Sequence, residues 1–362
     1  NWLAAGTTPS KTYTVKVVSD SGNKYRFDDF GTSAVTLELS EGGTFRFDQS
    51  DSSNSGHPLR FSTTSDGSHG GGSEYTTGVT TSGTPGSSGA YTEITVAASA
   101  PTLYYYCTQH SGMGGQANTP TTNSFSNFDG SIQTNISPNT TAGFSIVTWT
   151  GTGSAATIGH GLGGAPEYIS IKRRDSSGSW YAHHKGVDTS APENYYLQWH
   201  STGARTDNTT VFNDTSPTST VFSTGTAVGS SQTFIAYCFR SIKGFSKMSS
   251  YTGNGSSDGT FVYTGFRPAY LMVKRSNSTG NWAVYNNRSQ TANQMDKQMY
   301  YNLTNAEGTS GTKIFDFLSN GFKARGNAND TNASGSTYVY YAVAENPFVA
   351  NDSGTAVPVV AR

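Results

Sequence analysis

The sequence predicts an all-β fold, and three observations lead to that prediction. Short runs such as "TYTVKVV", "TFIAYCF" and "TYVYYAV" show the period-two alternation of β-strands and are rich in Val, Ile, Thr, Tyr and Phe. Turns rich in Gly, Ser and Thr separate these runs at the spacing of a sandwich or barrel. Almost no segment has the period of a long amphipathic helix.

Composition narrows the class of protein. The chain has 362 residues, enough for two or three domains that each bury a core. Charged residues make up only 13% of it, against roughly 25% in average globular chains. The net charge is −1 and the longest basic cluster is "IKRR" at Ile171–Arg174, so nucleic acid is not an expected partner.

Two features at the level of the whole chain concern its location. No apolar run approaches the roughly 20 residues of a membrane helix, so membrane insertion is not expected. The chain begins at Asn1 instead of methionine, which indicates processing or excision from a longer polypeptide. A leader would be lost with the missing part, and export therefore stays open.

The second half contains an internal duplication. The stretch "EYISIKRRDSSGSW" aligns with "AYLMVKRSNSTGNW", and Trp180 and Trp282 are equivalent at an offset of 102 residues. Both copies open on Gly-Phe-Ser, at Gly143 and Gly244. A period near one hundred residues is too long for a solenoid and fits two complete domains. We expect two similar β-sandwiches at 143–243 and 244–350.

The remaining segments follow from this division. Residues 11–120 have the length of another β-sandwich domain. Residues 121–142 are polar and weakly patterned, which predicts a linker. Residues 1–10 are expected to be a further linker and residues 351–362 a tail.

The first domain ends in the motif "LYYYCTQHSGMGG". Strand alternation turns Cys107 inward at the strand end, and a turn then returns His110 and Met113 to the same point. The stretch "NSGHPLRFS" supplies His57 at the start of another strand. Two imidazoles, one thiolate and a weak thioether are the donors that an electron-transferring copper ion prefers. The predicted metal ligands are His57, Cys107, His110 and Met113.

This motif has other interpretations. A lone C-x2-H would be better explained by a small buried core residue at Cys107, with His110 and Met113 in an ordinary loop. His69 is an alternative to His57, although its glycine-rich setting suits a metal ligand less well. A centre with two copper ions needs a second cysteine in the loop, and the motif has only one.

The spacing C-x2-H-x2-M at a strand end, with an upstream histidine in a small β-domain, resembles the cupredoxin family. The resemblance covers roughly a third of the chain. It implies a cupredoxin-like β-sandwich with His57, Cys107 and His110 as equatorial ligands and Met113 as the axial ligand. A complete ligand set also persists in domains kept only for their shape, so a copper site and a metal-free scaffold both stay open. No other cofactor is predicted.

The other cysteine and histidines are interpreted as structural. Cys238 aligns with Ala342 in the duplication, which indicates a small core residue. His183 and His184 are adjacent on a strand, point to opposite faces and cannot chelate one ion. Trp180 and Trp282 are interpreted as core anchors of their sandwiches in preference to sugar-stacking platforms.

No motif for enzyme chemistry occurs in the sequence. There is no Ser-His-Asp order, no paired-carboxylate motif and no phosphate-binding glycine loop, and "GHGLGGAP" is neither a P-loop nor a dinucleotide fingerprint. We therefore expect that the protein is not an enzyme.

The duplicated half, with "IGHGLGGAPEYISIKRR" and "YVYYAVAENPF", resembles a tandem β-domain of structural proteins from marine tailed bacteriophages. The first domain is similar to cupredoxin-like modules embedded in such virion proteins. The resemblance implies a tail fibre or a head-decorating fibre on the virion surface that serves host attachment. It also implies a homotrimer that contacts other virion proteins and a host receptor or glycan.

Two further functions remain as alternatives. One is a secreted blue-copper electron-transfer protein, which predicts a reversible one-electron couple. The other is a bacterial surface adhesin or lectin that stacks sugars on Tyr195, Tyr196 and Trp199 in "NYYLQWH". The lectin interpretation predicts that Trp199→Ala abolishes glycan binding.

Overall fold

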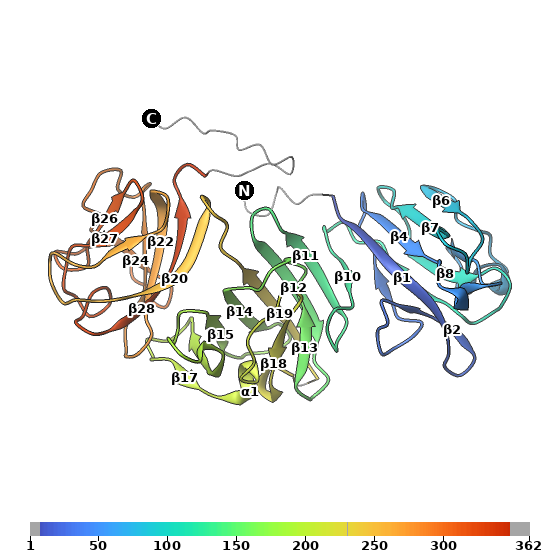
Figure 1. Ribbon diagram of the computed structural model, residues 1–362, viewed down its shortest axis with the longest axis horizontal. Coiled ribbons are helices and arrows are strands. Elements are labelled where there is room, and N and C mark those ends of the chain that lie inside the picture. The colour runs from blue at the N-terminus through green and yellow to red at the C-terminus, as the bar shows by residue number, and fades with distance from the viewer. Residues whose placement is uncertain (1–7, 230, 348–362) are drawn as a thin grey trace. The chain divides into compact units, whose positions relative to one another are not determined.

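The computed structural model describes residues 8–229 and 231–347, and β-strands dominate it (Figure 1). Most of the predicted linker 1–10 and all of the predicted tail 351–362 lie outside the described residues. The chain divides into two compact units. The first unit comprises 1–139 with 147–149 and 158–161, and the second comprises the other residues. Across the described ranges, no helix has the length and hydrophobicity needed to cross a membrane.

The first unit contains two sheets, drawn mainly in blue and cyan in Figure 1. Their strand orders are β2-β1-β4-β7-β6 and β3-β9-β8-β5. Strands β1 and β4 are parallel, as are β3 and β9. The strands are β1 (Ser10–Ser19), β2 (Asn23–Phe27), β3 (Leu37–Glu38), β4 (Thr44–Asp48), β5 (Leu59–Ser62), β6 (Val79–Ser82), β7 (Tyr91–Thr95), β8 (Leu103–Cys107) and β9 (Gly115–Asn118).

Aromatic side chains from both sheets meet in the core of the first unit. In β4 the inward Phe45 and Phe47 are buried while the residues between them are partly exposed, as period-two alternation requires. The ring of Phe47 lies 5.5 Å from that of Phe61 in β5. The ring of Phe27 in β2 lies 5.2 Å from that of Tyr105 in β8. Because these pairs join opposite sheets, the first unit is a β-sandwich, as predicted.

The structure corrects the prediction of a linker at 121–142. It contains β10 (Phe125–Asn127) and β11 (Thr134–Asn139), an antiparallel pair with Phe125 opposite Ile136. The polar Ser126 is buried because its carbonyl oxygen accepts from the Tyr13 hydroxyl at 2.8 Å and its own hydroxyl accepts a backbone N–H. Hydrogen-bonded polar residues therefore stand where the sequence pattern suggested exposed linker.

The first repeat contains one run of successive antiparallel neighbours, in the order β19-β14-β15-β16-β17. Two short helices lie between β17 and β19 in the chain. The elements are β12 (Phe144–Thr150), β13 (Ala156–Gly159), β14 (Tyr168–Arg173), β15 (Trp180–His184), β16 (Tyr195–Gln198), β17 (Thr206–Asp207), α1 (Thr209–Phe212), β18 (Val221–Thr224), α2 (Thr226–Gly229) and β19 (Thr233–Phe239). The 3-10 helices of the chain are η1 (Ser52–Asn54), η2 (Gly67–Gly70) and η3 (Pro192–Asn194).

The second repeat forms a six-stranded sheet, β20-β28-β22-β23-β24-β25, and a three-stranded sheet, β21-β27-β26. Rings from both sheets meet in one core, where Phe322 lies 5.1 Å from Tyr340. The strands are β20 (Ser246–Thr252), β21 (Phe261–Tyr263), β22 (Pro268–Arg275), β23 (Trp282–Asn286), β24 (Lys297–Tyr300), β25 (Gly308–Thr309), β26 (Phe315–Leu318), β27 (Gly321–Ala324) and β28 (Thr337–Ala344).

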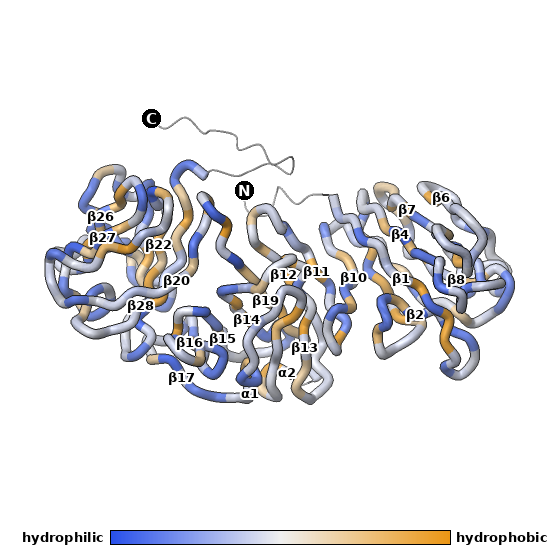
Figure 2. Tube along the Cα trace, viewed as in Figure 1, coloured by the Kyte–Doolittle hydropathy of each residue, from blue (hydrophilic) through white to orange (hydrophobic). Residues whose placement is uncertain are grey.

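The two repeats share their strand order. The run β28-β22-β23-β24-β25 repeats β19-β14-β15-β16-β17. One backbone hydrogen bond marks the equivalence: the Trp199 N–H donates to the Trp180 carbonyl at 3.2 Å, and the Tyr301 N–H donates to the Trp282 carbonyl at 3.1 Å. The second repeat and most of the first lie in the second unit, while 147–149 and 158–161 of the first repeat belong to the first unit. Figure 2 shows their hydrophobic residues along the strands and mainly hydrophilic residues in the loops.

Candidate metal centre

The structure brings together His57, Cys107 and His110, three of the four predicted ligands. The Cys107 Sγ lies 3.8 Å from the His57 Nδ1 and 3.8 Å from the His110 Nδ1. One donor atom from each residue lies within 4.8 Å of the others, and the two imidazole centroids are 4.6 Å apart. Within residues 8–229 and 231–347, no other group of three His, Cys, Asp or Glu side chains has this spacing.

Pairing of β5 with β8 explains how residues 50 positions apart meet. Leu59 in β5 lies opposite Cys107 in β8, and the Thr108 N–H donates to the Pro58 carbonyl at 3.2 Å. In an antiparallel pair, the residues that enter one strand lie beside the residues that leave the other. The segment carrying His57 therefore meets the end of β8.

Buried polar side chains hold His57 in place. Its carbonyl oxygen accepts from the Gln49 Nε2 at 2.9 Å and from the Tyr25 hydroxyl at 2.8 Å. Its N–H donates to the Asn54 carbonyl at 2.8 Å. The Asn54 side chain is fully buried and donates to the Val15 carbonyl at 2.7 Å. Sequence reasoning missed Gln49 and Asn54 because single polar residues in a loop carry no local signal of burial.

Met113 is buried in the loop that follows His110, with 1% of its surface exposed. Its carbonyl oxygen accepts from the Tyr25 N–H at 3.0 Å, which ties the loop to β2. A side chain at Gly114 would place its Cβ only 1.7 Å from the Tyr105 carbonyl oxygen. Only glycine therefore allows the loop to fold back against β8. Met113 stays the predicted fourth ligand.

His69, the alternative ligand, lies elsewhere. Its Nε2 is 3.0 Å from the backbone oxygen of Cys107, so the imidazole contacts the main chain. His69 does not belong to the group formed by His57, Cys107 and His110. The neighbouring Gly67 has a φ of +54°, and a Cβ there would lie 2.4 Å from the Tyr106 ring. The glycine-rich segment thus packs tightly on β8 and directs the His69 ring toward the main-chain oxygen of Cys107.

The three side chains differ in exposure. Cys107 is fully buried, His57 is partly buried and His110 is exposed. Burial, and secondly the charge of His110, lower the pKa of His57. His57 is therefore neutral near pH 7, with a ring lone pair available for a metal.

The spacing fits a metal ion. Bonds of about 2.3 Å to sulfur and about 2.05 Å to nitrogen that meet at about 120° separate the two donors by about 3.8 Å. Both Sγ–Nδ1 distances have this value. Copper and zinc both accept thiolate and imidazole, and a thioether as fourth ligand favours copper. The donor set of Cys107, His57 and His110 therefore fits copper or zinc, and the predicted fourth ligand Met113 is what favours copper.

The other cysteine, the histidine pair and Trp282 are buried, whereas Trp180 differs from the prediction of a core anchor. Cys238 is fully buried in β19, and burial raises the pKa of its thiol far above the ordinary value. His183 and His184 are buried in β15, in the second unit. Trp282 is fully buried, as expected for an anchor, whereas Trp180 is only partly buried and lines a pocket.

The fold and the cluster define an all-β protein whose first unit contains a group of two imidazoles and one thiol that could hold a metal ion. Residues 116–347 match the family model described as Domain of unknown function (DUF7483), and the chain belongs to this family. The matched range includes both repeats and begins after the last predicted ligand, Met113. No curated protein and no solved structure matches the chain.

Proposed function

We propose that this protein is a virion structural protein of a tailed bacteriophage whose cupredoxin-like amino-terminal domain holds one copper ion. The ligands are His57, Cys107, His110 and Met113. The observation that carries the metal part of the proposal is the pair of equal 3.8 Å distances from the Cys107 sulfur to two imidazole nitrogens. The β-sandwich that carries these residues supports the same assignment.

The virion part of the proposal rests on sequence. Both halves resemble structural proteins of marine tailed phages, and a chain with few charges, many Gly and Ser/Thr turns and short strands suits an exposed fibre. In this function the protein is a tail fibre or head-decorating fibre on the virion surface. It assembles as a homotrimer with other virion proteins and attaches to a host receptor or glycan.

The residues around the centre would hold copper in a preset geometry. Gln49, Asn54 and Tyr25 fix the main chain of His57, and the folded-back loop fixes Met113. Such outer contacts keep ligands oriented before the metal arrives. Bound copper would supply a one-electron redox centre. His110, the exposed ligand, leaves that centre accessible from solvent.

This exposure also supports the second candidate function, a secreted electron-transfer protein. An electron-transfer protein must bring its metal close to a redox partner, and His110 offers such an edge. The two functions differ in where the protein is found and in whether a soluble partner oxidises and reduces it. Cyclic voltammetry that shows no reversible one-electron couple in copper-loaded protein would exclude the second candidate.

Copper analysis tests the metal part. We expect one copper per chain by elemental analysis, together with an intense visible thiolate-to-copper band. Cys107→Ser should lose the band, and Cys238→Ser should keep it because Cys238 lies in the core of the second unit. Protein that takes up zinc but not copper, or no metal at all, would contradict the metal assignment.

The virion part has its own test. Purified particles of the encoding phage should contain the protein, and antibody-gold labelling should place it on the particle surface. Chemical cross-linking should give a trimer. Absence of the protein from purified particles would refute the virion assignment while leaving the copper result intact.

A further inference from the structure

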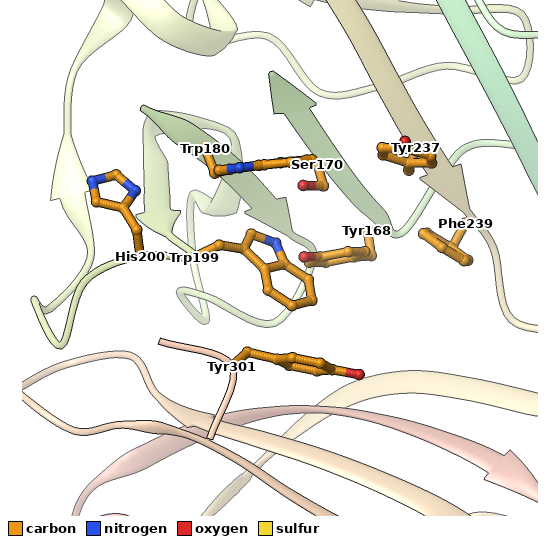
Figure 3. A pocket seen from close by; sticks show the side chains of 8 residues that line it. All are labelled: Tyr168, Ser170, Trp180, Trp199, His200, Tyr237, Phe239 and Tyr301. Atoms are coloured by element: carbon orange, nitrogen blue, oxygen red, sulfur yellow. The ribbon is translucent and has the colours of Figure 1, made fainter. Parts of the chain in front are cut away.

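The second unit contains a pocket of about 470 Å³ where side chains of both repeats meet. Figure 3 shows the residues that surround it. Most are aromatic. They include Tyr168, Ser170, Trp180, Trp199, Tyr237 and Tyr301. Pockets of this size, lined by aromatic rings with a few polar groups, are typical of small-ligand sites.

The duplication explains why the pocket is open. Trp199 and Tyr301 are equivalent residues of the two repeats. In the first repeat the Trp199 N–H donates to the Trp180 carbonyl, and in the second the Tyr301 N–H donates to the Trp282 carbonyl. Trp199 stacks on Trp282 of the other repeat, with centroids 5.0 Å apart and planes 6° apart. Tyr301, by contrast, is 51% exposed and lies across the pocket from Trp180 (Figure 3). Trp199 and Trp282 thus stack directly on each other. The equivalent pair, Tyr301 and Trp180, stands apart on opposite sides of the pocket, and the space between them can hold the ring of a ligand.

Three polar groups form one wall of this space. The hydroxyls of Tyr168 and Ser170 belong to residues that are 2% and 3% exposed. With the indole N–H of Trp199 they point toward one another in Figure 3. Within the described part of the chain, none of the three has a partner in good hydrogen-bonding geometry; the Tyr168 hydroxyl is near enough to Ser170 and Trp199 to interact with them, but the angles and distances of a full hydrogen bond are not met. Buried polar groups are seldom left in this state, so they indicate a ligand or a water molecule.

The proximity of these groups also has an electrostatic effect. Burial raises the pKa of Tyr168 far above its ordinary value, while Trp199 and Ser170 act in the opposite direction. The Tyr168 hydroxyl therefore stays protonated and can both donate and accept. Ser170 can do the same, and Trp199 can only donate.

The pocket selects for charge and shape. No Lys, Arg, Asp or Glu stands among the residues that line it, and its one titratable base, His200, is exposed. A charged ligand would lose its hydration without gaining an ion pair. A wholly aromatic ligand would leave the three polar groups unpaired. A ring with an apolar face and a rim of hydroxyls meets both requirements.

We propose that this pocket binds one neutral hexopyranose unit of a glycan, with the sugar face against Trp180 and the hydroxyl rim toward Tyr168, Ser170 and Trp199. Tyr237 extends the stacking surface, since its ring lies 6.2 Å from that of Trp180 at an angle of 22°. That the glycan belongs to a host surface rests on the attachment role proposed above. The capacity to bind a sugar rests on the pocket alone.

Calorimetric titration of the full chain with the methyl glycosides of glucose, galactose and mannose tests the proposal. At least one should bind. Tyr168→Phe should weaken that binding about tenfold or more, because the ligand loses a hydrogen bond inside the pocket. The same variant should keep or raise the melting temperature, because the lost hydroxyl has no partner in hydrogen-bonding geometry.

Tyr285→Phe is the matched control. The Tyr285 hydroxyl is also buried, but it donates to the Lys313 carbonyl at 3.1 Å, away from the pocket. This variant should lower the melting temperature and leave sugar affinity unchanged. The two tyrosines should therefore give opposite patterns.

Three results would overturn the proposal: no methyl glycoside binds at millimolar concentration, Tyr168→Phe binds as the wild type does, or adenosine binds in place of every sugar. Copper analysis of the same sample separates the two proposals. Copper-loaded protein without sugar binding refutes the pocket assignment alone. Sugar-binding protein that takes up no copper refutes the copper assignment alone.

Discussion

The two units contain the same reactive side chains and use them in opposite ways. In the first unit, Cys107 stands at the end of β8 with two imidazole nitrogens 3.8 Å from its sulfur. In the second unit, Cys238 is the last residue but one of β19, fully buried, with a thiol whose pKa is raised by burial. Cys107 meets two histidines that stand outside β8, whereas Cys238 lies opposite Ile169 of β14 and belongs to no such group within the described residues. The neighbours that the fold brings to each thiol thus separate a candidate metal ligand from a packing residue.

The histidines repeat this contrast. His57 and His110 turn one ring nitrogen each toward the cysteine. His184 instead has both ring nitrogens engaged by the main chain: its Nε2 lies 3.1 Å from the Tyr340 carbonyl, and its Nδ1 accepts from the Gly186 N–H at 3.0 Å. Only the neutral ring can make both hydrogen bonds. His184 is therefore a structural residue of the second unit.

The largest expected effect breaks the packing of the second unit while sparing the metal centre. Trp282 is fully buried, stacks on Trp199 and donates its indole N–H to the Gln198 carbonyl at 2.9 Å. Trp282→Ala should reduce the free energy of unfolding by about 3–5 kcal/mol. Urea denaturation followed by circular dichroism measures this loss.

Trp180→Ala is the control, because Trp180 is the equivalent residue and is only partly buried. It should cost about 1 kcal/mol, near the average for a substitution. Copper content should be unchanged in both variants. Equal losses of stability from the two substitutions would show that the repeats are packed alike, contrary to the comparison.

The next expected effect is a loss of stability of the second unit at acid pH. Burial lowers the pKa of His183 to about 4 and that of His184 to about 3. Unfolded histidine titrates near 6.5, so below that pH the unfolded chain binds more protons and the second unit loses stability. Between pH 6.5 and pH 5 each histidine should remove about 2 kcal/mol. Urea midpoints measured at pH 7 and pH 5 test this expectation.

His184→Gln identifies the residue responsible, because an amide can donate and accept but does not titrate in this range. The variant should lose part of the difference in stability between pH 7 and pH 5. If the difference stays the same as in the wild type, His184 is not one of the groups that take up protons on unfolding.

The smallest effect acts on the first unit alone. Asn54→Ala removes the buried hydrogen bond to the Val15 carbonyl and leaves that oxygen without this donor. The free energy of unfolding should fall by about 1–2 kcal/mol. Copper affinity should fall about tenfold, as when an outer contact of a ligand is lost. Competition with a copper chelator measures the affinity, and an unchanged value would show that Asn54 does not orient His57.

Sequence reasoning succeeded where a pattern is local. The run "TYTVKVV" lies within β1, and "TFIAYCF" coincides with β19. It failed at β10 and β11, because Ser126 and its neighbours are buried through hydrogen bonds to residues more than 80 positions away, such as Tyr13 and Glu38. A polar strand with distant partners has the local pattern of a linker.

By itself the sequence determined the β class, the duplication and the inward direction of Cys107, because alternation and turn chemistry act between near neighbours. Tertiary structure alone decided which distant residues meet. The pairing of β5 with β8 placed His57 beside Cys107. The packing of the repeats covered Trp282 with Trp199 and left Trp180 at an open pocket. Equivalent sequence positions received different surroundings because side-chain contacts between repeats depend on the whole fold, which no local pattern records.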